Sequence, residues 1–131
     1  MGSVKRATSD GLQTYISTNG TGYVRKPDYS NVSTVTKTGT GTVNETYTAT
    51  DDCWIAAFID IVNGSTITGC SVVIRSNDDI AISGDSVNGY GADATTGLVY
   101  VPKGQTIKIT WSGDDASTSG MTKFYRIWGC K

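Results

Sequence analysis

The sequence predicts an all-β protein, an antiparallel β-sandwich of jelly-roll type with about eight strands. Three observations predict it. The chain has 20 Thr, 13 Ser and 16 Gly but only two Pro, and from Tyr29 onwards Thr, Ser and Gly alternate with β-branched and aromatic residues. This composition favours twisted strands joined by tight turns and suits helices poorly. Turn signals recur every 8 to 12 residues or so, and no apolar pattern keeps a 3.6-residue period for three turns.

The chain of 131 residues has the length of one domain. Residues 1–22 are polar and rich in Gly, so we expect a tag remnant (Met1-Gly2-Ser3) followed by an extended lead-in or linker. The β-sandwich domain is expected to span residues 23–131. Pro27-Asp28 predicts a turn near its start, because Pro presets the first corner of a turn.

One strand stands out in the first half of the domain. Val32–Thr36 and Thr46–Thr48 are predicted as short strands around the Gly-rich stretch Thr38–Thr42, and Asp51-Asp52 as a turn. The next strand, Cys53–Val62, is apolar on both of its alternating faces. A strand covered on one side alternates apolar with polar residues, so this strand is expected to be covered on both sides. The second cover would come from the same chain or from another subunit.

The second half of the domain reads as further short strands with two long polar loops. Asn63-Gly64 is a hairpin-type turn. The predicted loops are Ser83–Gly97 and Ser112–Gly120, and loops of this length are often functional. The predicted strands are Thr66–Arg75, Ile80–Ile82, Leu98–Val101, Thr106–Trp111 and Lys123–Trp128. In Thr106–Trp111 we expect Ile107, Ile109 and Trp111 to point inward.

Charge and hydropathy argue against two classes of partner. Eleven basic and 12 acidic residues give a net charge of −1. There is no stripe of Lys and Arg, so nucleic acid is not expected as a partner. No stretch approaches the roughly 18 to 20 apolar residues of a membrane-spanning helix.

The titratable residues argue against catalysis. The chain has no His, which removes the commonest general base. Its paired carboxylates, Asp51-Asp52, Asp78-Asp79 and Asp114-Asp115, lie at turn positions, where Asp binds its own backbone. Asn77-Asp78-Asp79 with Asp85 and Asp93 offers oxygen ligands for calcium, but it lacks the 12-residue loop spacing of a calcium motif. We therefore expect no cofactor and no metal site.

The three cysteines, Cys53, Cys70 and Cys130, have neither the number nor the spacing of a zinc site. One disulfide is conceivable, for instance between Cys70 and Cys130, and the sequence does not select a pair. Because Cys53 and Cys70 lie in or beside strand patterns, we favour reduced thiols that pack as small apolar residues. Reduced thiols in turn favour folding inside a cell.

The aromatic residues divide into two groups. Trp54, Phe58, Trp111, Phe124 and Trp128 fall on strand positions and are expected in the core. Tyr90 lies between two Gly in the predicted loop Ser83–Gly97, where nothing obvious buries it. An exposed aromatic ring among Asn, Asp and Ser suits a sugar face or a protein interface. A Tyr lying back on its own domain is an equally good interpretation.

Four segments of the chain carry a resemblance to a known group of proteins. They are Pro27–Asn31, Thr46–Trp54, Val99–Ile107 and Phe124–Ile127. Together they resemble the C-terminal head domains of phage tail fibre and baseplate proteins, which are similar to trimeric jelly rolls of the tumour-necrosis-factor and complement-C1q type. The resemblance covers roughly residues 23–131. It implies a homotrimer on a virion tail appendage, folded in the host cytoplasm, that binds a host cell-surface glycan or protein through apical loops.

We therefore expect a non-enzymatic receptor-binding domain whose two predicted loops contact the ligand. The candidate ligand-binding residues are Tyr90, Asp85, Asn88, Asp93, Asp114 and Asp115. The alternatives are a monomeric carbohydrate-binding module or bacterial adhesin fragment, and a purely structural trimerisation cap. A hydrolase is the least favoured of the alternatives, since His and a spaced carboxylate pair are both missing.

Overall fold

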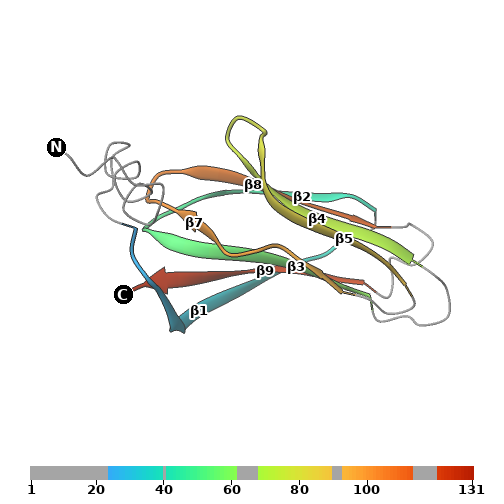
Figure 1. The fold of residues 1–131 in the computed structure, drawn as a ribbon, viewed down its shortest axis with the longest axis horizontal. Coiled ribbons are helices and arrows are strands. Elements are labelled where there is room, and N and C mark those ends of the chain that lie inside the picture. The colour runs from blue at the N-terminus through green and yellow to red at the C-terminus, as the bar shows by residue number, and fades with distance from the viewer. Residues whose placement is uncertain (1–23, 40, 62–67, 90–92, 114–120) are drawn as a thin grey trace, which may run out of the picture.

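The structure is a computed structural model that describes residues 24–39, 41–61, 68–89, 93–113 and 121–131. Within these residues the chain forms nine strands and no helix, arranged as two antiparallel sheets that pack face to face (Figure 1). The predicted fold class, an antiparallel β-sandwich of jelly-roll type, is confirmed.

We call the two layers sheet A and sheet B. Sheet A has the order β1 (Pro27–Lys37), β9 (Met121–Cys130), β3 (Cys53–Ile61) and β6 (Asp93–Thr95), and β7 (Val99–Val101) also pairs with β3. Sheet B has the order β2 (Val43–Thr48), β8 (Thr106–Gly113), β4 (Thr68–Ser76) and β5 (Ala81–Gly89).

Strands β6 and β7 behave as one interrupted strand, which explains why nine strands are found where about eight were expected. Both pair antiparallel with β3, β6 at Phe58 to Asp60 and β7 at Cys53 to Ile55. Counted as one, they leave eight strands, with first, last, third and sixth in one sheet and the rest in the other. That alternation between the layers is the jelly-roll order.

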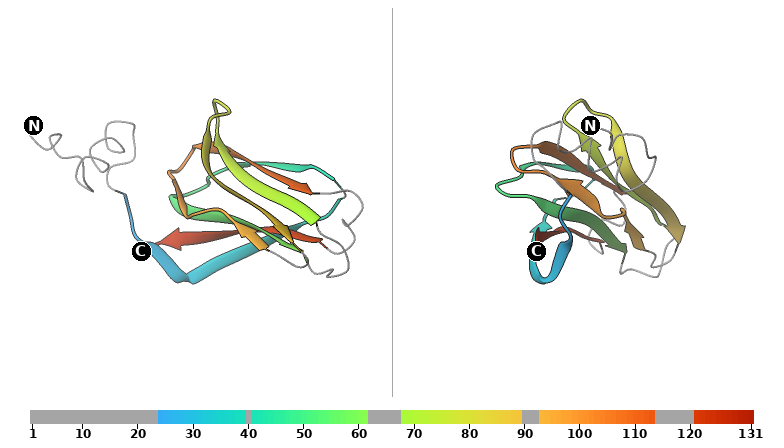
Figure 2. Two further views of the ribbon diagram at one scale, coloured as in Figure 1. Left: turned by 45° about the vertical axis from the view of Figure 1, so that its right-hand side comes forward. Right: turned by 60° about the vertical axis from the view of Figure 1, so that its left-hand side comes forward.

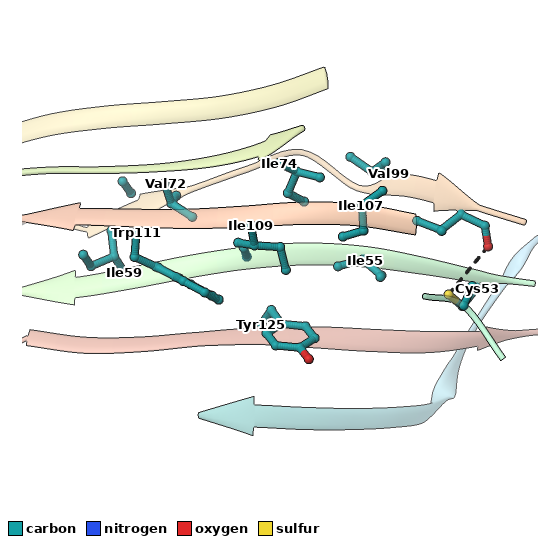
Figure 3. Close-up of a cluster of buried hydrophobic side chains, with 14 of the residues drawn as sticks. Cys53, Ile55, Ile59, Val72, Ile74, Val99, Ile107, Ile109, Trp111 and Tyr125 are labelled. Carbon is teal, nitrogen blue, oxygen red and sulfur yellow. Dashed lines mark hydrogen bonds between the residues drawn. The ribbon is translucent and has the colours of Figure 1, made fainter. Parts of the chain in front are cut away.

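The core lies between the inner faces of the two sheets (Figure 3). From sheet A, Ile55, Ala57 and Ile59 of β3 are fully buried. From sheet B, the three residues of β8 predicted to point inward, Ile107, Ile109 and Trp111, are buried as expected. The Nε1 of Trp111 donates a 2.9 Å hydrogen bond to the carbonyl of Phe58, so its one polar group is satisfied across the core.

One charged residue shares this interior. The side chain of Lys123, on β9, is 2% exposed, and its Nζ donates a 3.0 Å hydrogen bond to the carbonyl of Gly39. A buried ammonium needs such acceptors to offset its lost hydration. Lys123 therefore ties β9 to the chain just beyond β1.

The segment Ser83–Gly97 is not a long loop, and this prediction is wrong. Residues 81–89 form strand β5, which pairs with β4 from Thr68↔Gly89 to Arg75↔Ala81, and residues 93–95 form β6. β5 is an edge strand with mostly exposed side chains, so it carries no apolar alternation that the sequence could reveal. Its strand conformation comes from the hydrogen-bond ladder to β4.

Two smaller expectations also need correction. Pro27 and Asp28 do not make a turn but begin β1, whose register with β9 shifts between Pro27 and Val32. Pro is tolerated as the first residue of an edge strand because no ladder hydrogen bond is lost there. Ser112 and Gly113 end strand β8 rather than beginning a loop.

The joined ends of the domain and the ends of several other strands lie at opposite ends of the sandwich (Figure 2). At one end, the amide of Lys131 donates a 3.0 Å hydrogen bond to the carbonyl of Lys26, so the domain's entry and exit lie together. We call this the terminal end. At the other end, Ile61 pairs with Met121 and Thr68 with Gly89. The strand ends that flank residues 62–67, 90–92 and 114–120 therefore gather there, and we call it the connection end.

Candidate binding surface

The predicted ligand residues that the structure describes lie towards the connection end, on strands rather than on a loop. Asp85 and Asn88 belong to β5, and Asp93 begins β6. Tyr90, Asp114 and Asp115 fall outside the described residues. The structure thus brings three of the six candidates to one edge of the sandwich, where β5 of sheet B meets β6 of sheet A.

Asp85 and Asn88 already have structural contacts. Asp85 Oδ2 accepts a 3.4 Å hydrogen bond from the amide of Thr95, and its Oδ1 accepts one of 2.9 Å from the amide of Ser86. Asp85 therefore links the edge of sheet B to the edge of sheet A. The amide oxygen of Asn88 lies over Gly69 on the neighbouring strand, and a Cβ placed on Gly69 would come within 2.6 Å of it.

Asp93 faces a second carboxylate that the sequence did not single out. It lies directly opposite Asp60 in the β3–β6 ladder. Burial, and then the nearby charge of Asp93, raise the pKa of the Asp60 carboxyl. Like charges opposite each other in a ladder repel, so this pair is a local source of instability at neutral pH.

Sheet A carries a cluster of aromatic rings on its outer face, which we call the aromatic face. Its first row crosses four strands in register, Val32–Trp128–Trp54–Tyr100. The Trp54 and Tyr100 ring centroids lie 5.1 Å apart, and Tyr29 meets Trp128 edge-on at 6.3 Å.

A second aromatic row lies closer to the connection end. Phe58 and Phe124 are directly opposite each other and stack at 4.8 Å. The guanidinium of Arg126 lies over both rings, 5.3 Å from the Phe58 centroid and 5.1 Å from that of Phe124. Its Nε donates a 3.3 Å hydrogen bond to Thr34 Oγ1, which holds the cation in place over the rings.

These rings correct the predicted core. Of the five aromatic residues expected there, only Trp111 is in the core, whereas Trp54, Phe58, Phe124 and Trp128 are half-buried on the aromatic face. Of the two covers predicted for strand Cys53–Val62, the structure shows one: residues 53, 55, 57 and 59 are buried against sheet B, while Trp54 and Phe58 on the other face are half-buried. Val62 lies outside the described residues. The aromatic side of β3 has no further layer of the described chain over it.

The outer face of sheet B is polar, unlike the aromatic face of sheet A. Its cross-strand neighbours are hydroxyl and charged residues: Thr48 with Thr106, Thr46 with Lys108 and Arg75, Asn44 with Thr110. Thr48 and Thr106 join by a 2.8 Å hydrogen bond, and Thr110 donates one of 2.8 Å to Asn44 Oδ1. Such a surface is well hydrated. The two outer faces of this sandwich therefore have opposite chemistry.

A groove opens where the aromatic face meets the edge formed by β5 and β7. Its volume is about 410 Å³, and its lining is mostly apolar: Val24, Trp54, Ile82, Ser83, Leu98, Val99 and Tyr100. The amide of Gly97 donates a 2.8 Å hydrogen bond to Ser83 Oγ, which fixes the chain before β7 against β5. We call this hollow the edge groove.

A more polar hollow of about 280 Å³ lies at the terminal end and includes Asp51 and Asp52. Both carboxylates bind backbone, as the turn interpretation predicted. Asp51 Oδ1 accepts a 2.9 Å hydrogen bond from the amide of Asp52, and Asp52 Oδ1 accepts one of 2.9 Å from the amide of Lys103. Arg25 lies 3.7 Å from Asp52 Oδ2. This arrangement holds a turn together, and the free thiols of Cys53 and Cys130 also line the hollow.

The described residues contain no cluster of three or more Cys, Asp or Glu side chains placed to hold a metal ion. All three cysteines are free thiols, Cys53 and Cys70 buried and Cys130 half-buried. Burial raises the pKa of the Cys53 thiol to about 11, so it stays protonated and unreactive at neutral pH.

No protein-family model matches the sequence, and no curated protein matches it either. Across the described ranges, no helix has the length and apolar character needed to cross a membrane.

The sequence reasoning missed two features of this surface, the aromatic face and the Asp60–Asp93 pair. A signal for the first was present. Trp54 and Phe58 share one face of a strand whose other face is also apolar, and Phe124 and Trp128 share one face of the last strand. Two such strands side by side would make an aromatic surface. Their adjacency in sheet A is a long-range pairing that no local pattern specifies.

Proposed function

We propose that this chain is a non-enzymatic, homotrimeric receptor-binding domain of a phage tail appendage. It recognises a host cell-surface ligand, a saccharide in the first instance, through the connection end of the sandwich. The jelly-roll order of the strands, the aromatic face and the position of the termini at the end opposite residues 62–67, 90–92 and 114–120 support this proposal.

The aromatic face is the observation that carries the proposal. In a lone sandwich both outer faces meet water, and sheet B is built for that with Thr, Ser and Lys. Sheet A instead presents two rows of aromatic rings. Large exposed apolar patches on soluble proteins mark interaction sites. Burial between copies of the chain also stabilises a small sandwich.

The two ends of the domain support an attachment role. Lys26 and Lys131 lie together at the terminal end, so any further chain would join the domain there. Four connections, residues 38–42, 62–67, 90–92 and 114–120, join strands at the opposite end, while residues 49–52 and 102–105 connect strands at the terminal end. A domain held at one end by its neighbours presents the other to a receptor, and loops are where binding residues concentrate.

The test of receptor binding compares three proteins on bacterial cells and on immobilised bacterial surface polysaccharides. They are the wild type, a variant with residues 90–92 and 114–120 replaced by Gly-Ser linkers, and a control with Thr46→Asp and Thr106→Asp on sheet B. We expect the wild type and the control to bind one cell type or polysaccharide, and the linker variant to lose binding while staying folded. Binding that survives the linker replacement would remove these segments as the contact site, and a wild type that binds neither cells nor polysaccharides would remove the receptor assignment.

A monomeric carbohydrate-binding module is the second candidate, and the edge groove favours it. Trp54 and Tyr100 line a hollow large enough for a sugar ring, with the Ser83 hydroxyl at its wall. Aromatic rings of this kind stack against the apolar faces of pyranose sugars. This candidate predicts a monomer whose saccharide binding is lost on Trp54→Ala. The trimeric domain predicts three copies per particle by light scattering.

A further inference from the structure

We propose that copies of the chain join head to tail, with an apolar ridge on β1 of one copy seated in the edge groove of the next. The ridge consists of Tyr29 and Val32. This inference rests on the proposed trimer and specifies which two surfaces make it. The occupant of the edge groove is thus a second copy of this chain, and the contact is between two different surfaces.

Exposure singles out these two features. Among the described residues, five large hydrophobic side chains are exposed, and four of them belong to the ridge or the groove. On the ridge, Tyr29 is 64% exposed and Val32 45%, and in the groove Ile82 is 49% exposed and Leu98 40%. A protruding Tyr that enters a groove can bury an area of the order of 150 Å², which is why Tyr leads interface hot spots.

The ridge and the groove lie on opposite edges of sheet A. The first aromatic row runs from Val32 on β1 through Trp128 and Trp54 to Tyr100 on β7, so three strand spacings separate them. At about 4.8 Å a spacing this is close to 15 Å. One copy therefore cannot fill its own groove with its own ridge. Two different complementary surfaces on one molecule make a heterologous contact, which closes into a ring when the rotation allows.

Charge is complementary between the two edges. Near the ridge three cations, Lys26 and Lys131 at the joined chain ends and Arg126 on β9, outnumber the carboxylate of Asp28. Along the groove edge the carboxylates are Asp78 before β5 and Asp85 on β5, and the nearby cation Arg25 is paired with Asp52. Opposite charges on the two surfaces favour the head-to-tail arrangement, while ridge against ridge and groove against groove bring like charges together.

The variants that test this are Tyr29→Asp in the ridge and Leu98→Asp in the groove. Both side chains are exposed, so both variants are expected to unfold at nearly the wild-type denaturant concentration. Thr46→Asp on the outer face of sheet B is the matched control. Assembly is followed by native mass spectrometry and light scattering over a range of protein concentrations. We expect the concentration for half-assembly to rise about thirtyfold or more for the ridge and groove variants only.

Mixing the two variants provides the decisive readout. The Tyr29→Asp copy keeps an intact groove and the Leu98→Asp copy an intact ridge, so together they have one working contact. We expect 1:1 heterodimers in the mixture and monomers in each variant alone. An interface between like surfaces would give no such rescue.

The outcomes separate this inference from the proposed function. A wild type that stays monomeric at all concentrations would remove the trimer itself, and with it this contact. A trimeric wild type whose ridge and groove variants also remain trimeric would leave the trimer and remove only the ridge-in-groove contact. Variants that dissociate but fail to form heterodimers would overturn the head-to-tail arrangement. Should Leu98→Asp fold poorly, Ile82→Asp takes its place with the same expected results.

Discussion

The hydroxyl of Tyr125 donates a 3.0 Å hydrogen bond to Oε2 of Glu45, and this contact joins the two sheets at their β1–β2 side. Tyr125 comes from β9 of sheet A and Glu45 from β2 of sheet B. Lys37 on β1 completes the contact with a 2.9 Å bond from its Nζ to Oε1 of Glu45. Both carboxylate oxygens are therefore used to hold one layer against the other.

Tyr125→Phe removes the hydroxyl and leaves the ring in place. We expect this to lower the free energy of unfolding by about 1 to 2 kcal/mol, because a hydrogen bond to a charged group is lost in a largely buried position. Urea denaturation at pH 7 and a fixed protein concentration measures it. Tyr29→Phe is the matched control: the ring of Tyr29 is mostly exposed, and a change below about 0.5 kcal/mol is expected there. Equal costs for the two variants would show that the Glu45 contact contributes nothing.

The same contact makes stability depend on pH. The bond from Lys37, and after it that from Tyr125, hold the pKa of Glu45 below its ordinary value of 4.5. Glu45 therefore contributes stability that is present above pH 4.5 and is lost as pH falls through the lower pKa of the folded state. We expect Glu45→Gln to be less stable than the wild type at pH 7, with the difference shrinking towards pH 3. A difference that stays constant across this range would contradict the assignment.

Asp60 should behave in the opposite sense. Its pKa in the fold is raised above the ordinary 3.8 by burial and by Asp93, so its ionised form opposes folding. That cost is present above the folded pKa and vanishes as pH falls below about 3.8. Asp60→Asn is expected to stabilise the domain at pH 7, by an amount below about 1 kcal/mol, and to have no effect at pH 3. Denaturation at the two pH values checks this, and a destabilised variant at pH 7 would refute it.

The alternation of apolar and polar residues correctly predicted which side chains of β8 and β9 point into the core. Ile107, Ile109 and Trp111 point inward as the period of two requires, and Tyr125 and Ile127 face opposite to Phe124 and Trp128. The fold class followed from the same patterns. These predictions succeeded because each depends on a strand's own residues and on the existence of a core.

The predictions that were wrong concern features that depend on contacts with other parts of the chain. Strand β5 has polar, exposed residues and became a strand because β4 offers it a ladder, which no pattern within Ser83–Gly97 reveals. Trp54 and Phe58 were assigned to the core because they are large and apolar. Both faces of β3 are apolar, so its own sequence does not specify which face packs against sheet B. That choice depends on the side chains of sheet B that pack against it. The outer position of these rings is a property of the assembled sandwich.

The three thiols should react in a defined order. Cys53 and Cys70 are buried, whereas Cys130 is half-buried at the end of β9. Burial raises the pKa of all three, that of Cys53 to about 11, so no thiol is activated. With a disulfide-exchange reagent at pH 8 we expect one slow reaction in the native protein, at Cys130, and three in denaturant. Cys130→Ser should abolish the native reaction, and reaction of two thiols in that folded variant would contradict the burial pattern.

Substitutions of two isoleucines, one in the core and one in the edge groove, distinguish an effect on core stability from an effect on assembly. Ile59 is 0% exposed between the sheets and Ile82 is 49% exposed in the edge groove. Ile59→Ala leaves a cavity in a packed interior and is expected to cost about 2 to 5 kcal/mol in the free energy of unfolding. Ile82→Ala should cost less than about 1 kcal/mol in the dissociated chain, because its methyl groups already meet water.

The Ile82→Ala variant should instead raise the protein concentration for half-assembly. Ile59→Ala, where it remains folded, should leave that concentration near the wild-type value. Urea denaturation of dilute samples and light scattering of concentrated ones measure the two effects. Equal losses of stability, with no change in assembly for Ile82→Ala, would show that the edge groove is simply solvent-exposed surface.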